Sequence, residues 1–403
     1  MNNVYFYFCI LYLGFIPLNS TMIAAALPTI SSELSIDASV AMTYLIASYL
    51  IINLLFQVPS GYISDYYGSK NIIILGGMVI VFSSLLPFFS DNKNIIFISR
   101  NVLGLGGVLL TPALIAYVLS LRESKYVDNV MSTISSALGF SVAIGPVVGG
   151  FITNFAGWQY IFYINIPVYL FMIISIIFFN KGNLLRFENI KDKESFNVNS
   201  NYLSKVILAP KFLIGLVITF VYSMILYGMV SIIPFYISSR VGDDPTYVGF
   251  ILFTMTFSMA IMSILQKKIK DLKINNAKMI VSFPVIILSI TVLIYSDAVD
   301  LITVICCIFI GLSIGAVYGV SQSWIIRGGR GSARGVLAGV ASTARYLGGG
   351  VGILIVVMLD KVSNEKDSMS FIYNSLYVYM AIVFTSFIFV FFLLKKIDFT
   401  EKL

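Results

Sequence analysis

The chain has 403 residues, of which 58% are hydrophobic and only 11% carry a charge. Soluble domains carry about 25% charged residues, so this composition excludes a soluble protein and indicates a polytopic, all-α membrane protein. The net charge of +7 does not indicate nucleic-acid binding, because most Lys and Arg residues gather in loops on one side of the predicted membrane. The chain contains no histidine, which excludes a His-based metal site or a His proton relay.

Twelve apolar runs are long enough to cross a bilayer, which takes about 20 mostly apolar residues. The predicted spans are 5–28, 40–61, 71–90, 95–118, 130–154, 158–180, 206–236, 246–266, 279–296, 301–323, 335–358 and 371–394. The polar segment 181–205 has the mixed charge and Asn/Ser content of a linker. We therefore predict an N-terminal six-helix bundle at 1–180, a cytoplasmic linker at 181–205 and a C-terminal six-helix bundle at 206–403.

Charge placement predicts the orientation. The basic residues lie mainly in the loops that share a side with both termini, whereas acids such as Asp243, Asp297 and Asp360 lie on the opposite side. The positive-inside rule then places both termini in the cytoplasm of a cell-membrane protein with multiple spans.

The two halves also echo each other weakly. The segment "GLGGVLLTPALIAYVLSLRES" (104–124) has the same layout as "GLSIGAVYGVSQSWIIRGGRG" (311–331), and "SSALGFSVAIGPVVGG" matches "ASTARYLGGGVGILI". Repeated six-helix halves are the layout of secondary transporters, whose substrate site lies at the midplane between the halves.

Five ordered segments carry a more specific signal: "STMIAAALPTI" (20–30), "GYISDYYGSKN" (61–71), "SRNVLGLGG" (99–107), "IGPVVGG" (144–150) and "WQYIFYINIP" (158–167). Together they resemble the signatures of the major facilitator superfamily, and in particular its drug:proton antiporters. In the second segment Tyr66 and Ser69 replace the usual arginines. The resemblance implies the fold of that superfamily, with twelve transmembrane helices in two six-helix pseudo-repeats.

The segment 61–71 is a short polar stretch between two uncharged spans. Gly61 and Gly68 allow a tight reversal with positive φ, and Asp65 is expected near the positive N-terminus of the helix predicted at 335–358. The resemblance implies that Gly61, Asp65, Gly68, Lys70 and Arg334 form a conformational latch between the halves. The alternative is an ordinary cytoplasmic turn, which the same residue types also suit.

The segment 144–150 contains Gly145, Pro146, Gly149 and Gly150. Small residues let membrane helices approach closely, and Pro146 removes a backbone donor and bends its helix. The resemblance identifies this segment as an antiporter motif and implies a dry seal between the halves.

No acidic residue falls in the middle of a predicted span, and Asn19 occupies a position where many fourteen-helix relatives carry Asp. Arg100 and Arg345 instead lie within spans. A charge inside the membrane is a functional hypothesis by default, and a guanidinium binds carboxylate or phosphate in bidentate fashion. The alternative for Arg100 is that it reaches the interface or pairs with backbone carbonyls.

Polar and aromatic residues complete the predicted cavity. Tyr49, Asn53 and Gln57 recur at every fourth residue of the second span and so share a face. Residues expected on the opposite wall are Tyr222, Tyr227, Tyr318 and Gln322. The aromatic members of both sets are also compatible with packing or interface positions.

The leading hypothesis is a secondary active transporter that exports small amphipathic molecules by alternating access, as a proton-coupled antiporter similar to multidrug-efflux proteins. The alternative is a dedicated exporter of an anionic or zwitterionic metabolite, such as a metallophore or siderophore. A lipid or glycolipid flippase is a weaker alternative. We predict no enzymatic activity, cofactor or metal site; the expected partners of this monomer are a small-molecule substrate, the proton gradient and the lipid bilayer.

Overall fold

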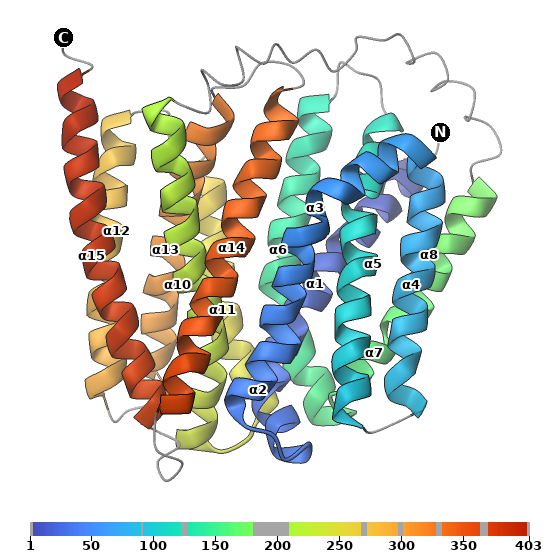
Figure 1. The fold of residues 1–403 in the computed structure, drawn as a ribbon, viewed down its shortest axis with the longest axis horizontal. Helices are drawn as coiled ribbons and strands as arrows, with labels where there is room; N and C mark the ends of the chain where they lie inside the picture. Colours follow the sequence, from blue (N-terminus) through green and yellow to red (C-terminus); the bar gives the residue numbers. More distant parts are fainter. Residues whose placement is uncertain are drawn as a thin grey trace.

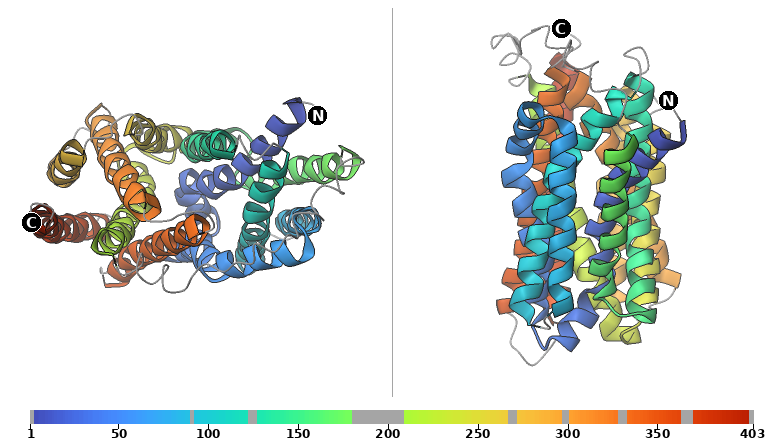
Figure 2. Two further views of the ribbon diagram at one scale, coloured as in Figure 1. Left: turned by 90° about the horizontal axis from the view of Figure 1, so that it is seen from above. Right: turned by 90° about the vertical axis from the view of Figure 1, so that its right-hand side faces the viewer.

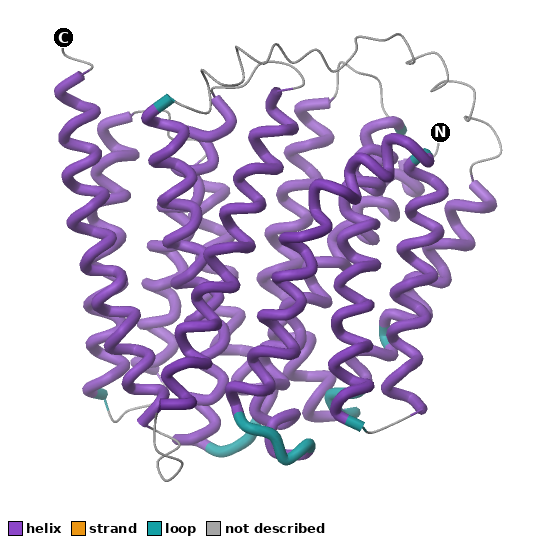
Figure 3. The backbone as a smooth tube through the Cα atoms, in the orientation of Figure 1, coloured by secondary structure: helices purple, strands orange, loops and turns teal. Residues whose placement is uncertain are grey.

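The computed structural model describes residues 3–89, 92–121, 127–179, 209–266, 272–296, 301–327, 333–362 and 370–400. These residues are almost entirely helical, and no strand occurs among them (Figures 1 and 3). Within them, 12 helices or runs of helices are long and apolar enough to cross a membrane. This confirms the predicted all-α membrane class with twelve spans.

The helices fall into a first series, α1–α8, and a second series, α10–α15. The first series comprises α1 (Asn3–Glu33), a continuous run of α2 (Ala38–Met42), the π-helix η1 (Thr43–Ala47) and α3 (Ser48–Tyr67), then α4 (Ser69–Phe89), α5 (Lys93–Ser120), α6 (Val127–Phe155), α7 (Tyr160–Tyr163) and α8 (Asn165–Phe179). The second series comprises α10 (Pro210–Val241), α11 (Pro245–Gln266), α12 (Leu272–Tyr295), α13 (Leu301–Arg327), α14 (Ala333–Val362) and α15 (Ser370–Thr400).

The two series repeat one packing pattern. Helix α1 packs on α6 as α10 packs on α14, and α4 packs on α5 and α8 as α12 packs on α13 and α15. Contacts of α6 with α11 and of α3 with α14 join the series (Figure 2). The predicted linker at 181–205 lies outside the described residues, so the division into 1–180 and 206–403 stays a prediction.

Helix α1 begins and α15 ends at the same end of the molecule (Figure 1). We call this the terminal end, and we call the opposite end, where α2 lies, the far end.

Glycines bring α6 against the backbone of α1. A Cβ added to Gly149 would lie 2.1 Å from the carbonyl oxygen of Met22, and one added to Gly145 would lie 2.8 Å from that of Leu18. Apolar burial does not drive association between helices in lipid, so such close backbone contact supplies much of the attraction. The predicted close packing of these two glycines therefore has a defined partner, the α1 backbone.

The second series makes the same contact with its own glycines. A Cβ on Gly348 of α14 would lie 2.2 Å from the carbonyl oxygen of Phe220, and one on Gly352 would lie 2.3 Å from that of Met224. In both series the two glycines stand one helical turn apart. The weak sequence similarity between the fifth and eleventh spans therefore corresponds to the same glycine-mediated helix contact.

The reversal between the second and third spans is sharper than the sequence predicted. Helix α3 continues to Tyr67, and α4 begins at Ser69, so the turn consists of Gly68 with φ +84°. The prediction that Gly61 also shapes this reversal is wrong, because Gly61 lies inside α3 and nothing stands within 4 Å of its missing Cβ. The polar residues after Gly61 are compatible with a helix that extends beyond the apolar run.

These two glycines therefore form a matched pair for a stability test. The Gly68→Ala variant forces a Cβ into a left-handed conformation and should lower stability by about 1–2 kcal/mol. The Gly61→Ala variant removes backbone freedom from a helix interior and should leave stability unchanged or raise it by about 0.5–1 kcal/mol. Thermal denaturation of the detergent-solubilised protein measures both; equal melting temperatures for the two variants would contradict the assignment of the turn.

Candidate functional site

Hydrogen bonds between described residues join the series at the far end. The backbone N–H of Ser39 in α2 donates to Oδ2 of Asp360 in α14 over 3.1 Å, and Asn154 Nδ2 donates to Thr246 Oγ1 over 3.0 Å. Asp37 occupies the N-cap position of α2 but makes no side-chain cap hydrogen bond. A carboxylate is favoured at a helix N-terminus, so Asp360 supplies from the second series the cap that the local sequence does not.

The same region holds a direct backbone contact between α6 and α11. A Cβ on Gly150 would lie 2.1 Å from the carbonyl oxygen of Pro245, and a Cβ on Gly249 would lie 2.4 Å from that of Pro146. These residues include half of the predicted antiporter motif. Because neither glycine has room for a methyl group, the two helices touch along their backbones here.

Within the part of the chain that the structure describes, the turn between α3 and α4 at the terminal end makes no such hydrogen bond to the second series. Asp65 is exposed in the last turn of α3, Gly68 forms the turn, and Lys70 is half-buried in the first turn of α4. The side chain of Arg334, the predicted partner of Asp65, lies outside the described residues. The latch therefore stays a prediction.

Arg100 of α5 is only 1% exposed and is held by other parts of the first series. Its Nε donates to the Leu45 carbonyl (3.0 Å), Nη1 to Asn19 Oδ1 (3.3 Å) and Nη2 to the Ser20 carbonyl (3.1 Å). Its guanidinium carbon also lies 4.6 Å from the centroid of the Tyr49 ring. Leu45 belongs to the π-helix η1. For Arg100 the sequence left open a ligand-binding role, a side chain that reaches the interface, and pairing with backbone carbonyls. The structure favours the last of these.

Asn19 is fixed in turn by the sixth span. Its Nδ2 donates to Asn165 Oδ1 over 2.8 Å, and near the end of α1 the indole Nε1 of Trp158 donates to Glu33 Oε2 over 2.8 Å. The segment 158–167 therefore attaches α7 and α8 to α1 at two points. This attachment orients the amide that contacts Arg100.

Arg345 of α14 has a different environment. Its guanidinium carbon lies 5.1 Å from the centroid of the Tyr346 ring, and Tyr222, Tyr227 and Tyr318 are within electrostatic range. The side chain is half-buried, and its Nε is shielded from solvent without a hydrogen-bond partner among the described residues. The second arginine is therefore surrounded by neutral phenols, and at least one of its donors is unused.

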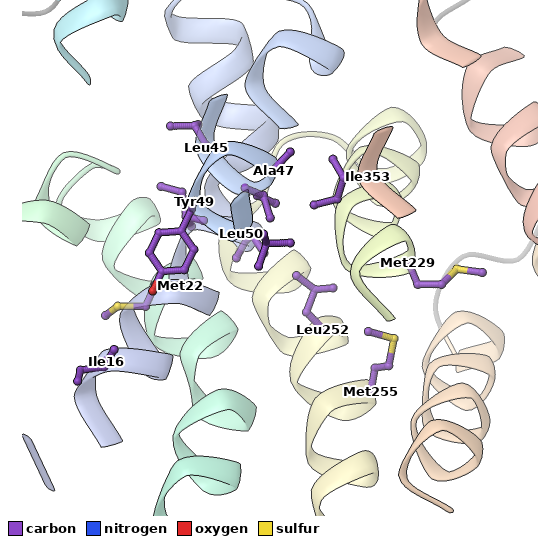
Figure 4. Packing of buried hydrophobic residues seen from close by; sticks show 14 of the residues in the cluster. Ile16, Met22, Leu45, Ala47, Tyr49, Leu50, Met229, Leu252, Met255 and Ile353 are labelled. Atoms are coloured by element: carbon purple, nitrogen blue, oxygen red, sulfur yellow. The ribbon is translucent and has the colours of Figure 1, made fainter. Parts of the chain in front are cut away.

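The residues around Arg100 in the first series lie near the residues around Arg345 in the second series. Tyr49, which stacks with Arg100, is within electrostatic range of both Tyr346 and Tyr227. Buried apolar side chains of both series, including Leu50 and Ile353, pack in one cluster around this region (Figure 4). The structure thus brings most of the predicted aromatic and cationic residues together where the series join.

Three predicted residues contribute less. Asn53 is buried and donates to the backbone carbonyl of Tyr49 in its own helix, and Gln57 is half-buried one turn further along. The side chain of Gln322 lies outside the described residues. Tyr49 is therefore the member of the predicted stripe that contacts an arginine.

Sequence reasoning gave no role to Tyr346 or Asp360, and it did not identify what Asn165 contacts. The position of Tyr346 directly after Arg345 was an available signal, but the partner of Asp360 lies in the other series and has no sequence signature. No group of three or more His, Cys, Asp or Glu side chains gathers within the described residues. The groups described above therefore offer no set of metal ligands.

Comparison with known proteins gives three concordant findings. The model of the Major Facilitator Superfamily matches residues 9–353. The chain is 31% identical over 173 residues to the Methylenomycin A resistance protein of Bacillus subtilis (strain 168), an alignment that covers 41% of this chain and 36% of the relative. It is 25% identical over 246 residues to Multidrug resistance protein 2 of the same organism, covering 60% and 61%. Each alignment spans less than two thirds of the relative's own length.

A likeness to solved structures concerns the fold alone. The crystal structure of a D-xylose-proton symporter superimposes with a TM-score of 0.73 at 14% identity, covering 96% of this chain and 97% of that one.

The contact between Asp360 and α2 can be tested with a cysteine reporter. Ala41 of α2 is fully buried, as are the native cysteines, so Ala41→Cys should react with a membrane-impermeant maleimide only when the far end opens. Adding Asp360→Ala removes a charge-assisted hydrogen bond worth about 1.5–3 kcal/mol and should speed labelling about 10-fold.

Asp243→Ala is the control for this test, because Asp243 is an exposed far-end acid that accepts a hydrogen bond from Ser238 of its own series. Equal labelling rates in the two variants would contradict a role for Asp360 in closing the far end.

Proposed function

Because this chain belongs to the Major Facilitator Superfamily, we propose that it exports small amphipathic molecules from the cytoplasm in exchange for protons. Two features support export. The relatives include proteins named for resistance to methylenomycin A and to multiple drugs, and the segment 144–150 has the pattern of the antiporter motif. Both the proton coupling and the direction of transport belong to the proposal.

The observation that supports alternating access is the asymmetric contact between the two series. At the far end a charged cap from Asp360 and the Gly150–Gly249 contact hold the series together, whereas Asp65 at the terminal end is exposed. A protein that opens to one side at a time needs contacts that can form at either end but not at both together. This arrangement fits one state of an alternating-access cycle, closed at the far end.

We place the terminal end in the cytoplasm of a cell membrane, in line with the charge bias of the loops. In the opposite state of the cycle, Asp65 would approach the first turn of α14, where Arg334 and the helix N-terminus favour an anion. The latch at the terminal end and the Asp360 cap at the far end would then alternate. Each would stabilise the state that the other opposes.

Export is tested in cells that lack their own efflux proteins. Cells that express the chain and are loaded with ethidium or with norfloxacin should lose at least one of them faster than cells without it. Collapse of the pH gradient with nigericin should remove the difference. Efflux of neither compound would contradict the proposed function, and efflux that persists without the pH gradient would contradict proton coupling.

Two glycines of α6 provide matched variants for this assay. Gly150→Ala places a methyl group against the Pro245 carbonyl, whereas nothing lies within 4 Å of a Cβ on Gly139. Overpacking costs about 1–3 kcal/mol, so Gly150→Ala should slow efflux roughly 10-fold while Gly139→Ala retains it.

The latch is tested with the same Ala41→Cys reporter. If Asp65 stabilises the state that is open at the far end, Asp65→Asn should slow labelling by about 2- to 5-fold, since a charge at a helix terminus contributes about 0.3–1 kcal/mol. Asp243→Asn, at an exposed acid outside both contacts, should leave the rate unchanged. A labelling rate that Asp65→Asn does not alter would leave 61–71 as an ordinary turn.

A further inference from the structure

The two intramembrane arginines differ in how their charge is satisfied. Arg100 is fully buried and directs three nitrogens at protein oxygens. Arg345 is half-buried, its Nε has no hydrogen-bond partner among the described residues, and its electrostatic neighbours are tyrosines. An arginine remains protonated in a protein, and an uncompensated charge within the membrane is costly. Arg345 is therefore not explained by the structural role that accounts for Arg100.

Four tyrosine rings gather around Arg345. The ring of Tyr346 lies 5.1 Å from the guanidinium carbon, and Tyr222 and Tyr318 pack edge to face with centroids 5.1 Å apart. Tyr227 lies against α14, where a Cβ on Gly349 would stand 2.5 Å from its ring. Aromatic rings favour offset or edge contacts with other rings.

Access and hydrogen-bonding capacity complete the site. Tyr227, Tyr318, Tyr346 and Arg345 are each partly exposed, so the cluster is not sealed inside the protein. The hydroxyl of Tyr222 is buried and makes no hydrogen bond of normal geometry among the described residues, although the Ser223 hydroxyl is close to it. Buried polar groups that lack a partner are uncommon and require an explanation. A bound molecule with an acceptor oxygen would pair with Arg345, and a second acceptor would suit the Tyr222 hydroxyl.

We infer that the cluster of Arg345, Tyr222, Tyr227, Tyr318 and Tyr346 binds an aromatic carboxylate, with the carboxylate on Arg345 and the ring among the tyrosines. As an assignment of the cargo class, this rests on the proposed export function. A carboxylate matches the fork of the guanidinium, and within the described residues no carboxylate of the chain competes for it. Multidrug-type cargo that carries only a positive charge would instead be repelled.

Equilibrium binding to the purified, detergent-solubilised chain tests the inference without transport. The probes are 2-naphthoate, 2-naphthamide and 2-naphthylmethylammonium, which share one ring system and differ in charge. Isothermal titration calorimetry should show that naphthoate binds about 10- to 100-fold more tightly than the amide, as expected for a charge-assisted hydrogen bond, and that the cation binds least.

Variants of Arg345 test whether this residue causes the preference for naphthoate. Arg345→Gln should abolish the difference between naphthoate and naphthamide, and Arg345→Lys should retain part of it. Lys93→Gln removes one positive charge at an exposed position outside the cluster and should keep the full difference. If Arg345→Gln does not stay folded, as its thermal melting temperature would show, Arg345→Met replaces it, because this variant also removes the charge. Full retention of the preference in a folded variant without the charge would overturn the pairing.

Equal affinity for the three probes, or preference for the cation, would overturn the inference. The binding and efflux experiments can fail independently of each other. Naphthoate preference without efflux of any compound would leave the inference standing and remove the export proposal. Nigericin-sensitive efflux of ethidium without naphthoate preference would do the reverse.

Discussion

The structure depends on one constraint of the bilayer, which is that helices in lipid gain little from hiding apolar surface from each other. Close backbone approach must replace that driving force. In each series the first span and the fifth span meet through two glycines one turn apart. These are Gly145 and Gly149 on α6, and Gly348 and Gly352 on α14. These paired contacts give the two series similar packing. They also fix the positions of the helices that carry the polar residues of the site.

The scarcity of polar partners within the membrane also explains how the two intramembrane arginines differ. Polar groups in the membrane must find partners within the protein, and Arg100 finds them in the carbonyls of Leu45 and Ser20 and the amide of Asn19. It thereby ties α5 to α1 and to η1 inside one series. Arg345 lies instead where the series meet, among side chains that offer it no negative charge. The first arginine is satisfied by the fold, and the second retains capacity for a ligand.

Much of the fold was predictable, because hydropathy reports directly on the length of a span. The twelve spans and the superfamily are confirmed, but the end of α3 was placed at residue 61, although the helix continues to Tyr67. Charged and polar residues end an apolar run without ending a helix, and hydropathy does not distinguish the two. The site was harder to predict. Hydropathy identified Arg100 and Arg345 as unusual, but the partners of both, and the cap that Asp360 gives α2, depend on helices far apart in the chain.

The π-helix η1 contains Leu45, whose carbonyl accepts from Arg100, and it directly follows α2, in which the Ser39 N–H donates to Asp360. A π-turn contains one more residue per hydrogen-bonded loop than an α-turn, so it sets the angular phase between the segments on either side. An α-helix rotates by about 100° per residue, and deletion of one residue from 43–47 would therefore turn Ser39 away from the second series. The chain should accordingly tolerate changes of side chain in this segment better than changes of its length.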